Sequence, residues 1–324
     1  MKTRRLGKTG FEVSEIGLGC WQLGGDFGPV GDETATAILD AANQAGVTFW
    51  DTADVYGGGM SESRIGGHAK GAVVHVATKL GRGGALFPDN YSKEGIRKSL
   101  EGSAERLGVS SLDLAQLHCV PLGVLQDGAI FGWMDELKVE GLIKHWGASV
   151  ETIEEGLICL EQPGLATLQI IFNLFRQDAA EVLLPKAAEK DVGIIVRLPL
   201  ASGLLSGKFS KDTQFEASDH RNYNANGDAF SVGETFAGIP FQRGVELVNE
   251  LKGYAPGGME MSQFALRWIL DHPEVSTIIA GVSKPEQLAD NVAASELRSL
   301  FPALMGQLKS WYEESVKPEI RGGV

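Results

Sequence analysis

Four ionisable residues stand out because each lies at, or shortly after, the end of a short apolar run. They are Asp51, Tyr56, Lys79 and His118. Taken singly, each has an ordinary explanation: the aspartate caps a helix, the tyrosine packs, the lysine is solvated and the histidine is structural. If the runs are neighbouring parallel strands, however, their carboxyl ends meet on one face and the four side chains converge there. Four coincidences at one place are improbable, so the sequence predicts a catalytic site for proton transfer.

The elements that must position these side chains are indicated by short apolar runs alternating with longer amphipathic stretches, as in a parallel sheet with connecting helices. One such helix is expected in residues 92–108, where Ser92 is a suitable N-cap and Gly108 a suitable C-terminal cap. Eight strands with helices between them favour an α/β fold, a (β/α)8 TIM barrel in a single domain over residues 1–324, above an open doubly wound sheet. The expected strands are residues 15–19, 48–51, 73–79, 112–118, 145–149, 167–172, 193–198 and 276–280.

One connection is unusual, because residues 203–238 are polar, rich in glycine and about three times longer than an ordinary connection. The segment follows the seventh expected strand, so its root lies on the face where barrels of this type place their chemistry. We expect a lid over the cofactor, and a floppy insertion is the alternative.

Composition narrows the class of protein. The net charge of -13 opposes binding to nucleic acid or to an anionic membrane surface. No signal peptide or membrane span is recognisable, and three cysteines without CxxC spacing fit a reducing cytoplasm. No GxGxxG follows the first strand, and the six histidines form no HExxH or close pair, so neither a Rossmann fold nor a metal site is expected.

The sequence resembles the aldo-keto reductase superfamily over nearly the whole chain. Its four catalytic positions fall on the residues named at the outset. The motifs that carry the resemblance are LGKTGFEVSEIGLGCWQLGG near the N-terminus, GVTFWDTADVYGGGMSESRIG, ATK at 77–79, DLAQLH at 113–118, GAS at 147–149, QIIFN at 169–173, PLASGLLSGKF at 199–209 and GVSKPEQLADN at 281–291.

The resemblance implies hydride transfer between NADP(H) and a carbonyl, in which Tyr56 protonates the alkoxide as it forms. A phenol with its usual pKa donates reluctantly, so Lys79 is expected to lower the pKa of Tyr56 and Asp51 to hold the ammonium. His118, as a neutral imidazole, is expected to orient the carbonyl oxygen. Trp21, together with Tyr56 and His118, is expected to bind substrate, with Phe87 and residues 119–123 at an apolar entrance.

The cofactor positions implied by the resemblance come from several strand ends and from the last βα unit. Lys284 and Ser283 are expected at the adenosine 2'-phosphate, which favours NADP(H) over NAD, with Gln287 and Asn291 facing the adenine. Arg197-Leu198 replace the usual aromatic-Ser pair and Val150 replaces an Asn, so Arg197 either stacks on the nicotinamide or lies elsewhere. The full set is Ser149, Gln169, Asn173, Arg197, Leu200, Gly203, Lys208, Gly281, Ser283, Lys284, Gln287 and Asn291.

Several functions remain open at this stage. The same residues suit a small aldehyde, ketone or sugar as substrate, or a sugar or polyol dehydrogenase working in the oxidative direction. Members of the same family also serve as non-enzymatic, cofactor-sensing subunits of potassium channels. A phosphate-binding isomerase with a barrel fold is disfavoured by the Tyr and Lys at the strand ends. The segment 301–316 either packs over the barrel or faces a partner.

Overall fold

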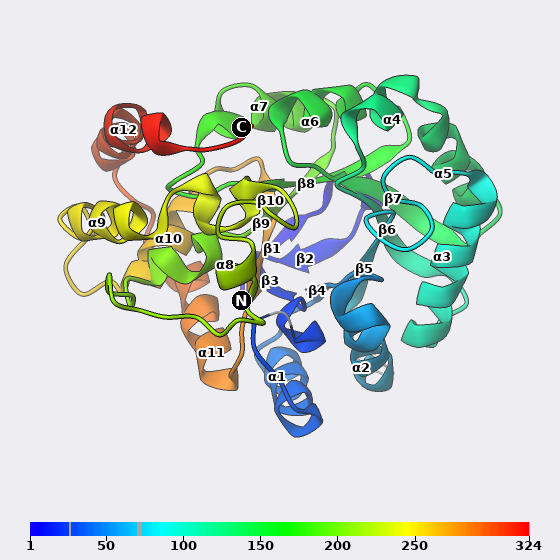
Figure 1. Cartoon of the computed structure of the whole chain (residues 1–324), viewed down its shortest axis with the longest axis horizontal. Helices are drawn as coiled ribbons and strands as arrows, with labels where there is room; N and C mark the ends of the chain where they lie inside the picture. The colour runs from blue at the N-terminus through cyan, green and yellow to red at the C-terminus, as the bar shows by residue number, and fades with distance from the viewer. Residues whose placement is uncertain (26, 70–72, 324) are drawn as a thin grey trace.

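The computed structural model describes residues 1–25, 27–69 and 73–323. Eight parallel strands close into a barrel in the order β10-β3-β4-β5-β6-β7-β8-β9, which confirms the expected (β/α)8 TIM barrel (Figure 1). The domain prediction for residues 1–324 includes residues 26, 70–72 and 324, which lie outside the described residues. The barrel strands are β3 (Ile16–Gly19), β4 (Phe49–Asp51), β5 (His75–Leu80), β6 (Leu112–His118), β7 (Ile143–Ser149), β8 (Leu165–Ile171), β9 (Gly193–Arg197) and β10 (Val275–Gly281).

All eight expected strands are present, with ends that differ by up to two residues. The third begins at His75 rather than at Val73, because pairing with β4 starts where His75 lies opposite Phe49. The lengths of the strands follow from this pairing, which the sequence pattern alone does not reveal.

Helices cover the outside of the barrel (Figure 1). In α3 (Lys93–Leu107) the Ser92 hydroxyl accepts a hydrogen bond from the Gly95 N–H at 3.2 Å, and Gly108 ends the helix with φ of 69°, as expected. The other main helices are α1 (Asp32–Gln44), α2 (Met60–His68), α4 (Leu122–Asp127), α5 (Ala129–Val139), α6 (Ile153–Leu160), α7 (Leu183–Glu189), α9 (Phe241–Leu251), α10 (Met261–Leu270), α11 (Pro285–Ala293) and α12 (Pro302–Trp311).

An N-terminal hairpin that the sequence analysis did not anticipate closes the amino-terminal end of the barrel. It pairs β1 (Thr3–Arg5) with β2 (Glu12–Ser14) in antiparallel fashion. Leu6 and Val13 are fully buried in a cluster with the barrel residues Phe49, Ala77, Leu114, Ile195 and Ile279. Because this end is plugged by apolar side chains, a ligand can enter the barrel only from the opposite end.

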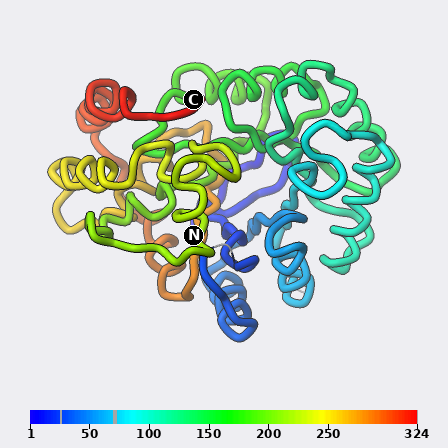
Figure 2. The backbone as a smooth tube through the Cα atoms, viewed as in Figure 1, coloured from blue at the N-terminus to red at the C-terminus, as the bar shows by residue number. Residues whose placement is uncertain are grey.

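The long segment 203–238 lies at the carboxyl end of the barrel and contains short helices, among them α8 (His220–Tyr223) (Figure 2). Asn224 is fully buried and holds the segment together, because its side chain accepts from the Ala229 and Phe230 N–H groups and donates to Thr235 Oγ1 at 3.0 Å. Such a network gives the segment a defined local structure.

The C-terminal segment packs on its own barrel. In α12, Leu308 is fully buried and the Leu308 carbonyl accepts from Gln177 Nε2 at 3.4 Å, while the ring of Trp311 lies 6.0 Å from that of Phe175. Of the two placements considered for 301–316, the structure has the one over the barrel. Among the described residues, no helix is long and apolar enough to cross a membrane.

Candidate active site

A pocket of about 760 Å³ opens at the carboxyl ends of the strands, within the range of small-molecule and cofactor sites. Its lining combines residues that end β3, β4, β6, β8, β9 and β10 with residues of the long segment. The lining joins residues that are far apart in the sequence. It includes Tyr56 and His118 as well as Ser283 and Asn291 of the last βα unit.

Lys79 lies at the centre of the four predicted catalytic residues. Its Nζ donates to Asp51 Oδ1 at 2.5 Å, to the Thr52 carbonyl at 2.7 Å and to the Tyr56 hydroxyl at 3.1 Å. Lys79 and Asp51 are each 1% exposed, so the ion pair is closed to solvent. The parallel register explains the meeting, since Asp51 lies opposite Ala77 and Lys79 follows two residues later on the same face of β5.

Burial and charge act in opposite directions on these groups. Burial alone would lower the pKa of Lys79, but Asp51 and Tyr56 outweigh it, so the net pKa is raised and the ammonium persists. For Tyr56 the largest effect is burial, which raises the pKa of the phenol, while Lys79 lowers it. Lys79 thus acts in the direction expected from the sequence, but burial, which the sequence reasoning left out, outweighs it, and the net pKa of Tyr56 is raised.

His118 ends β6 next to this group, with its ring edge-on to Tyr56 at 5.9 Å between centroids. Burial, followed by the charges of Arg82, Lys79 and Arg197, lowers the pKa of His118 well below its usual value, so the imidazole is neutral. His118 Nδ1 is buried and has no hydrogen-bond partner among the described residues. A neutral ring with an unsatisfied nitrogen is suited to hydrogen bonding with a ligand.

Asp51 is held by a second set of bonds that sequence reasoning missed in part. Asp51 Oδ2 accepts from Gln116 Nε2 at 3.0 Å and from Gln169 Nε2 at 2.8 Å, and Ser149 Oγ donates to Gln169 Oε1 at 3.3 Å. Gln116 could have been noticed because it lies two residues before His118 on the same face of its strand. Gln169, expected at the cofactor, therefore also orients Asp51.

The predicted cofactor residues fall into two groups in the structure. Ser149 and Asn173 are buried and outside the pocket lining; the Asn173 side chain donates to the Leu198 carbonyl at 2.9 Å. Lys284 is exposed, as the residue preceding α11, and is also outside the lining. Those that line the pocket are Gln169, Arg197, Leu200, Gly203, Lys208, Gly281, Ser283, Gln287 and Asn291.

The N-terminus of α11 provides donors for an anion. The Ser283 and Lys284 N–H groups and the Ser283 hydroxyl all donate to Gln287 Oε1, at 2.8, 3.2 and 3.2 Å. A phosphate at this helix end would take over donors that the Gln287 amide holds. The backbone of Gly281 lies close to the Gln22 side chain in the same part of the pocket, and a Cβ atom at residue 281 would collide with that side chain. This end of the pocket therefore fits the phosphate of a dinucleotide such as NADP(H).

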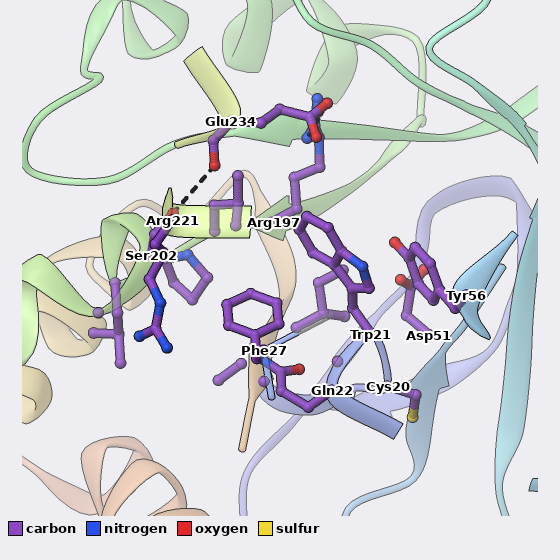
Figure 3. Close-up of a pocket in the computed structure, with 18 of the residues that line it drawn as sticks. Cys20, Trp21, Gln22, Phe27, Asp51, Tyr56, Arg197, Ser202, Arg221 and Glu234 are labelled. Carbon is purple, nitrogen blue, oxygen red and sulfur yellow. Dashed lines mark hydrogen bonds and ion pairs between the residues drawn. The ribbon is translucent and has the colours of Figure 1, made fainter. Parts of the chain in front are cut away.

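Aromatic rings form one wall of the pocket (Figure 3). Trp21 lies between Tyr56 and Arg197 in this view, stacked on the Tyr56 ring at 5.7 Å between centroids. Phe27 packs edge-on against Trp21 at 5.0 Å, and Phe230 of the long segment lies at 6.1 Å. Trp21 was predicted; Phe27 and Phe230 lie in irregular segments where no sequence pattern marks them. Phe87, Cys119 and Pro121 also line the pocket, as expected for its entrance.

Arg197 is 8% exposed, and its side chain points towards Glu234 of the long segment (Figure 3). Its Nη1 lies 3.1 Å from Glu234 Oε1 and its Nη2 donates to the Val150 carbonyl at 2.9 Å. The same Glu234 oxygen accepts from Arg82 Nη1 at 2.7 Å. Sequence reasoning missed both Arg82 and Glu234, although Arg82 follows a strand end as the catalytic candidates do.

Comparison with known proteins identifies relatives along almost the entire chain. The model described as the Aldo/keto reductase family matches residues 15–313. Aldo-keto reductase YhdN of Bacillus subtilis (strain 168) is 32% identical over 299 residues, which cover 89% of this chain and 87% of the relative. A probable voltage-gated potassium channel subunit beta of Oryza sativa subsp. japonica is 29% identical over 98% of both chains.

Solved structures give the same result for the fold. The structure of glycerol dehydrogenase AKR11B4 from Gluconobacter oxydans matches with a TM-score of 0.79 at 28% identity, over 100% of this chain and 98% of that one.

Proposed function

Because this chain belongs to the aldo/keto reductase family, we propose that it is an NADP(H)-dependent oxidoreductase that reduces the carbonyl of a small aldehyde, ketone or sugar to an alcohol. The observation that carries the proposal is the buried chain of contacts from Asp51 through Lys79 to the Tyr56 hydroxyl, with neutral His118 beside it. When bound, NADPH supplies the hydride.

The residues of the chain supply proton transfer and orientation. Tyr56 donates its hydroxyl proton to the carbonyl oxygen as negative charge develops there, and Lys79 stabilises the phenolate left behind. Asp51 keeps the ammonium charged and aimed at Tyr56. His118 donates a hydrogen bond to the same carbonyl oxygen and so fixes the direction from which the carbon is attacked. The aromatic wall around Trp21 excludes water from the reacting groups.

The residues near α11 would hold the phosphate of the dinucleotide. The Ser283 N–H and hydroxyl would donate to the 2'-phosphate in place of the Gln287 amide oxygen, and the exposed Lys284 would add a positive charge. The buried side chains of Ser149 and Asn173 would act on the nicotinamide end indirectly, because they are hydrogen bonded to Gln169 and to the Leu198 carbonyl, and both of these residues line the pocket.

The segment 203–238 acts as the lid over this cofactor. Its residues Gly203 and Lys208 line the pocket, and Ala201, Ser202 and Gly203 at its root have φ values of 47°, 55° and 96°. Two of these are non-glycine residues in the left-handed region, a conformation kept only where the surroundings enforce it. The root is therefore poised to change its backbone conformation when the segment moves.

The protonation state of Tyr56 favours reduction at neutral pH. Burial raises the pKa of the phenol, so the proton needed for donation is present, whereas alcohol oxidation requires Tyr56 to accept a proton. Oxidation of a sugar or polyol is the second candidate, and it should increase as the pH is raised. The G. oxydans relative is named a glycerol dehydrogenase. The three cysteines are free and buried, which suits a protein of the reducing cytoplasm.

The test is a substrate screen with a matched pair of variants. The wild-type protein should oxidise NADPH with aldehydes, and Tyr56→Phe should lower kcat by about 100-fold or more while NADPH binding, followed by tryptophan fluorescence, is kept. Tyr254→Phe removes a hydroxyl outside the pocket lining and serves as the control. Unchanged turnover in Tyr56→Phe would show that another group donates the proton.

A non-enzymatic role is suggested by the rice channel subunit, to which the similarity extends over 98% of both chains. It predicts NADPH binding without turnover of any carbonyl or alcohol. The same screen separates the two, because binding is read by fluorescence and turnover by absorbance of the reduced nicotinamide.

A further inference from the structure

Two glutamine side chains, Gln116 and Gln169, lie inside the barrel, where apolar side chains are usual. They are 0% and 1% exposed. Gln169 contributes to the pocket lining, whereas Gln116 does not. Burying an amide away from water costs free energy unless its hydrogen bonds are made within the protein. The partners of the two amides therefore indicate what these side chains do.

Both amides converge on the carboxylate of Asp51. Gln116 Nε2 donates to Asp51 Oδ2 at 3.0 Å, and Gln169 Nε2 donates to the same oxygen at 2.8 Å. Gln169 Nε2 also donates to Gln116 Oε1 at 3.3 Å. A carboxylate paired with a lysine only accepts hydrogen bonds, so each amide must direct its nitrogen towards Asp51. Gln116 therefore uses both ends of its amide, one on Asp51 and the other on Gln169.

These contacts reach Asp51 across the interior of the barrel. Asp51 ends β4, whereas Gln116 lies on β6 and Gln169 on β8, and neither of these strands is a neighbour of β4 in the sheet. On the neighbouring strand β5, the residue opposite Gln116 is Lys79. Gln116 thus lies beside both members of the buried ion pair, and it holds the carboxylate from a strand that the pairing of β4 does not fix.

The orientation of the Asp51 carboxylate matters because its two oxygens have different tasks. Oδ1 accepts from Lys79 Nζ, which also donates to the Tyr56 hydroxyl at 3.1 Å. The terminal torsion of an aspartate is broad and roughly two-fold, so the covalent structure alone does not fix the plane of the carboxylate. Donors on Oδ2 fix that plane and keep Oδ1 on the ammonium. The aim of Lys79 at the phenol therefore depends on the amides behind Asp51.

The two amides differ in what else they must serve. Gln169 lines the pocket and is expected at the cofactor, and its Oε1 accepts only a long hydrogen bond, from Ser149 Oγ at 3.3 Å. A dinucleotide in the pocket would compete with Asp51 for the amide of Gln169. Gln116 lies behind the lining and has no ligand to bind. It is the donor that can stay on Asp51 while the pocket is occupied.

We propose that Gln116 is a positioning residue for the proton transfer: its amide holds Asp51 Oδ2, and so keeps Oδ1 on Lys79, when Gln169 engages the dinucleotide. The proposal rests on the proposed function and adds to it a side chain that touches neither substrate nor cofactor. Loss of this hold should lower kcat, because the ammonium is then no longer fixed at the Tyr56 hydroxyl as the proton leaves. Binding of the aldehyde and of NADPH does not use Gln116 and should be kept.

The first variant, Gln116→Met, removes both hydrogen bonds and nearly preserves the volume of the side chain. The probes are para-nitrobenzaldehyde, butanal and glyceraldehyde, each with NADPH. We expect kcat to fall by about tenfold or more, since a hydrogen bond to a charged group is worth about ten- to a hundredfold. KM for the aldehyde, and the Kd of NADPH measured by tryptophan fluorescence without substrate, should stay close to the wild-type values.

A matched control is available in Gln177, a buried glutamine outside the pocket lining. Its Nε2 donates to the carbonyls of Leu174 and Leu308 at 3.2 and 3.4 Å, and it is 6% exposed. Gln177→Met also removes hydrogen bonds from a buried amide, so it should lower the free energy of unfolding. It should leave kcat unchanged, which separates loss of stability from loss of positioning.

The second variant, Gln116→Glu, separates hydrogen bonding from packing because it keeps the shape of the side chain. Two carboxyl groups then share one place, and the Lys79 ammonium keeps the negative charge on Asp51, so the pKa of the introduced carboxyl should be raised well above its usual value. While protonated, this carboxyl can donate to Asp51 as the amide does; once ionised, it repels Asp51.

The activity of Gln116→Glu should therefore depend on pH. At pH 6 its kcat should be close to that of the wild type, and by pH 9 the ratio of the two should have fallen by about tenfold or more. Circular dichroism at both pH values checks that the variant stays folded. This readout holds even if Gln116→Met does not fold, because it compares one variant with itself.

The outcomes separate this proposal from the proposed function. An unchanged kcat in Gln116→Met, or a Gln116→Glu ratio that does not fall with pH, overturns the role of Gln116 and leaves the reductase intact. An equal loss in Gln116→Met and in Gln116→Glu at pH 6 also overturns it, because a protonated carboxyl should replace the amide. Failure of the wild type to reduce any of the three probes, with NADPH still bound, counts against both.

Discussion

Replacement of Asp54 by Asn should stabilise the protein at neutral pH. Asp54 lies in the loop that carries Tyr56, where its Oδ2 accepts from Ser99 Oγ at 2.9 Å. Its Oδ1 is buried without a hydrogen-bond partner among the described residues. Burial, together with the negative charge of Glu62, raises the pKa of Asp54 from 3.8 to about 6.

The size of the effect follows from this pKa. Because the folded state binds the proton more tightly than the unfolded state, ionisation of Asp54 costs folding free energy once the pH passes 3.8, and the full cost is reached above about pH 6. The difference between the two pKa values corresponds to about 3 kcal/mol. Since Asp54 is partly exposed, solvent reduces this figure, and we expect Asp54→Asn to gain about 1 to 3 kcal/mol at pH 7.

Urea unfolding at a series of pH values between 4 and 8 measures this gain. The difference in free energy of unfolding between Asp54→Asn and the wild type should be small near pH 4, grow up to about pH 6 and then remain constant. Asp89→Asn, at an exposed carboxylate of a nearby loop, should show no such trend. A gain that does not depend on pH, or a loss at pH 7, would refute the assignment of the cost to the buried carboxylate.

Two predictions concern the cofactor. Lys284→Glu should weaken NADPH much more than NADH in fluorescence titrations, because it places a negative charge beside the 2'-phosphate; equal weakening would assign Lys284 to a shared part of the dinucleotide or to stability. NADPH should protect the segment 203–238 from trypsin at Lys208, Lys211 and Arg221, whereas substrate alone should not. Cleavage at the same rate with and without NADPH would rule out the lid.

The barrel was predictable because its strands are buried on both faces and therefore read as apolar runs, with helices of ordinary amphipathic pattern between them. The hairpin β1–β2 was missed for a physical reason. Its strands have three residues each, too few to show a period, and what stabilises them is burial of Leu6 and Val13 against side chains from five barrel strands. Such long-range packing leaves no local pattern in the sequence.

The candidate site likewise contains features that could be predicted from the sequence and features that could not. The residues Asp51, Lys79 and His118 could be identified because each ends a strand, and in a parallel barrel a shared strand end means a shared location. The raised pKa of Tyr56 could not, since it depends on how deeply the ring is buried rather than on its neighbours in the sequence. Glu234 could not either, because it lies in an irregular segment and meets Arg82 only through the path of the folded chain.

The position of Glu234 connects the proposed lid with the wall of the pocket. Its carboxylate accepts from Arg82 Nη1 at 2.7 Å and lies 3.1 Å from Arg197 Nη1, and its carbonyl accepts from Ser202 Oγ at 3.1 Å at the root of the same segment (Figure 3). If the segment opens for cofactor exchange, both contacts of this carboxylate must break, and the buried Arg197 guanidinium loses its carboxylate partner. Removing one partner from a buried ion pair is costly, so the contacts of Glu234 favour the closed position of the segment.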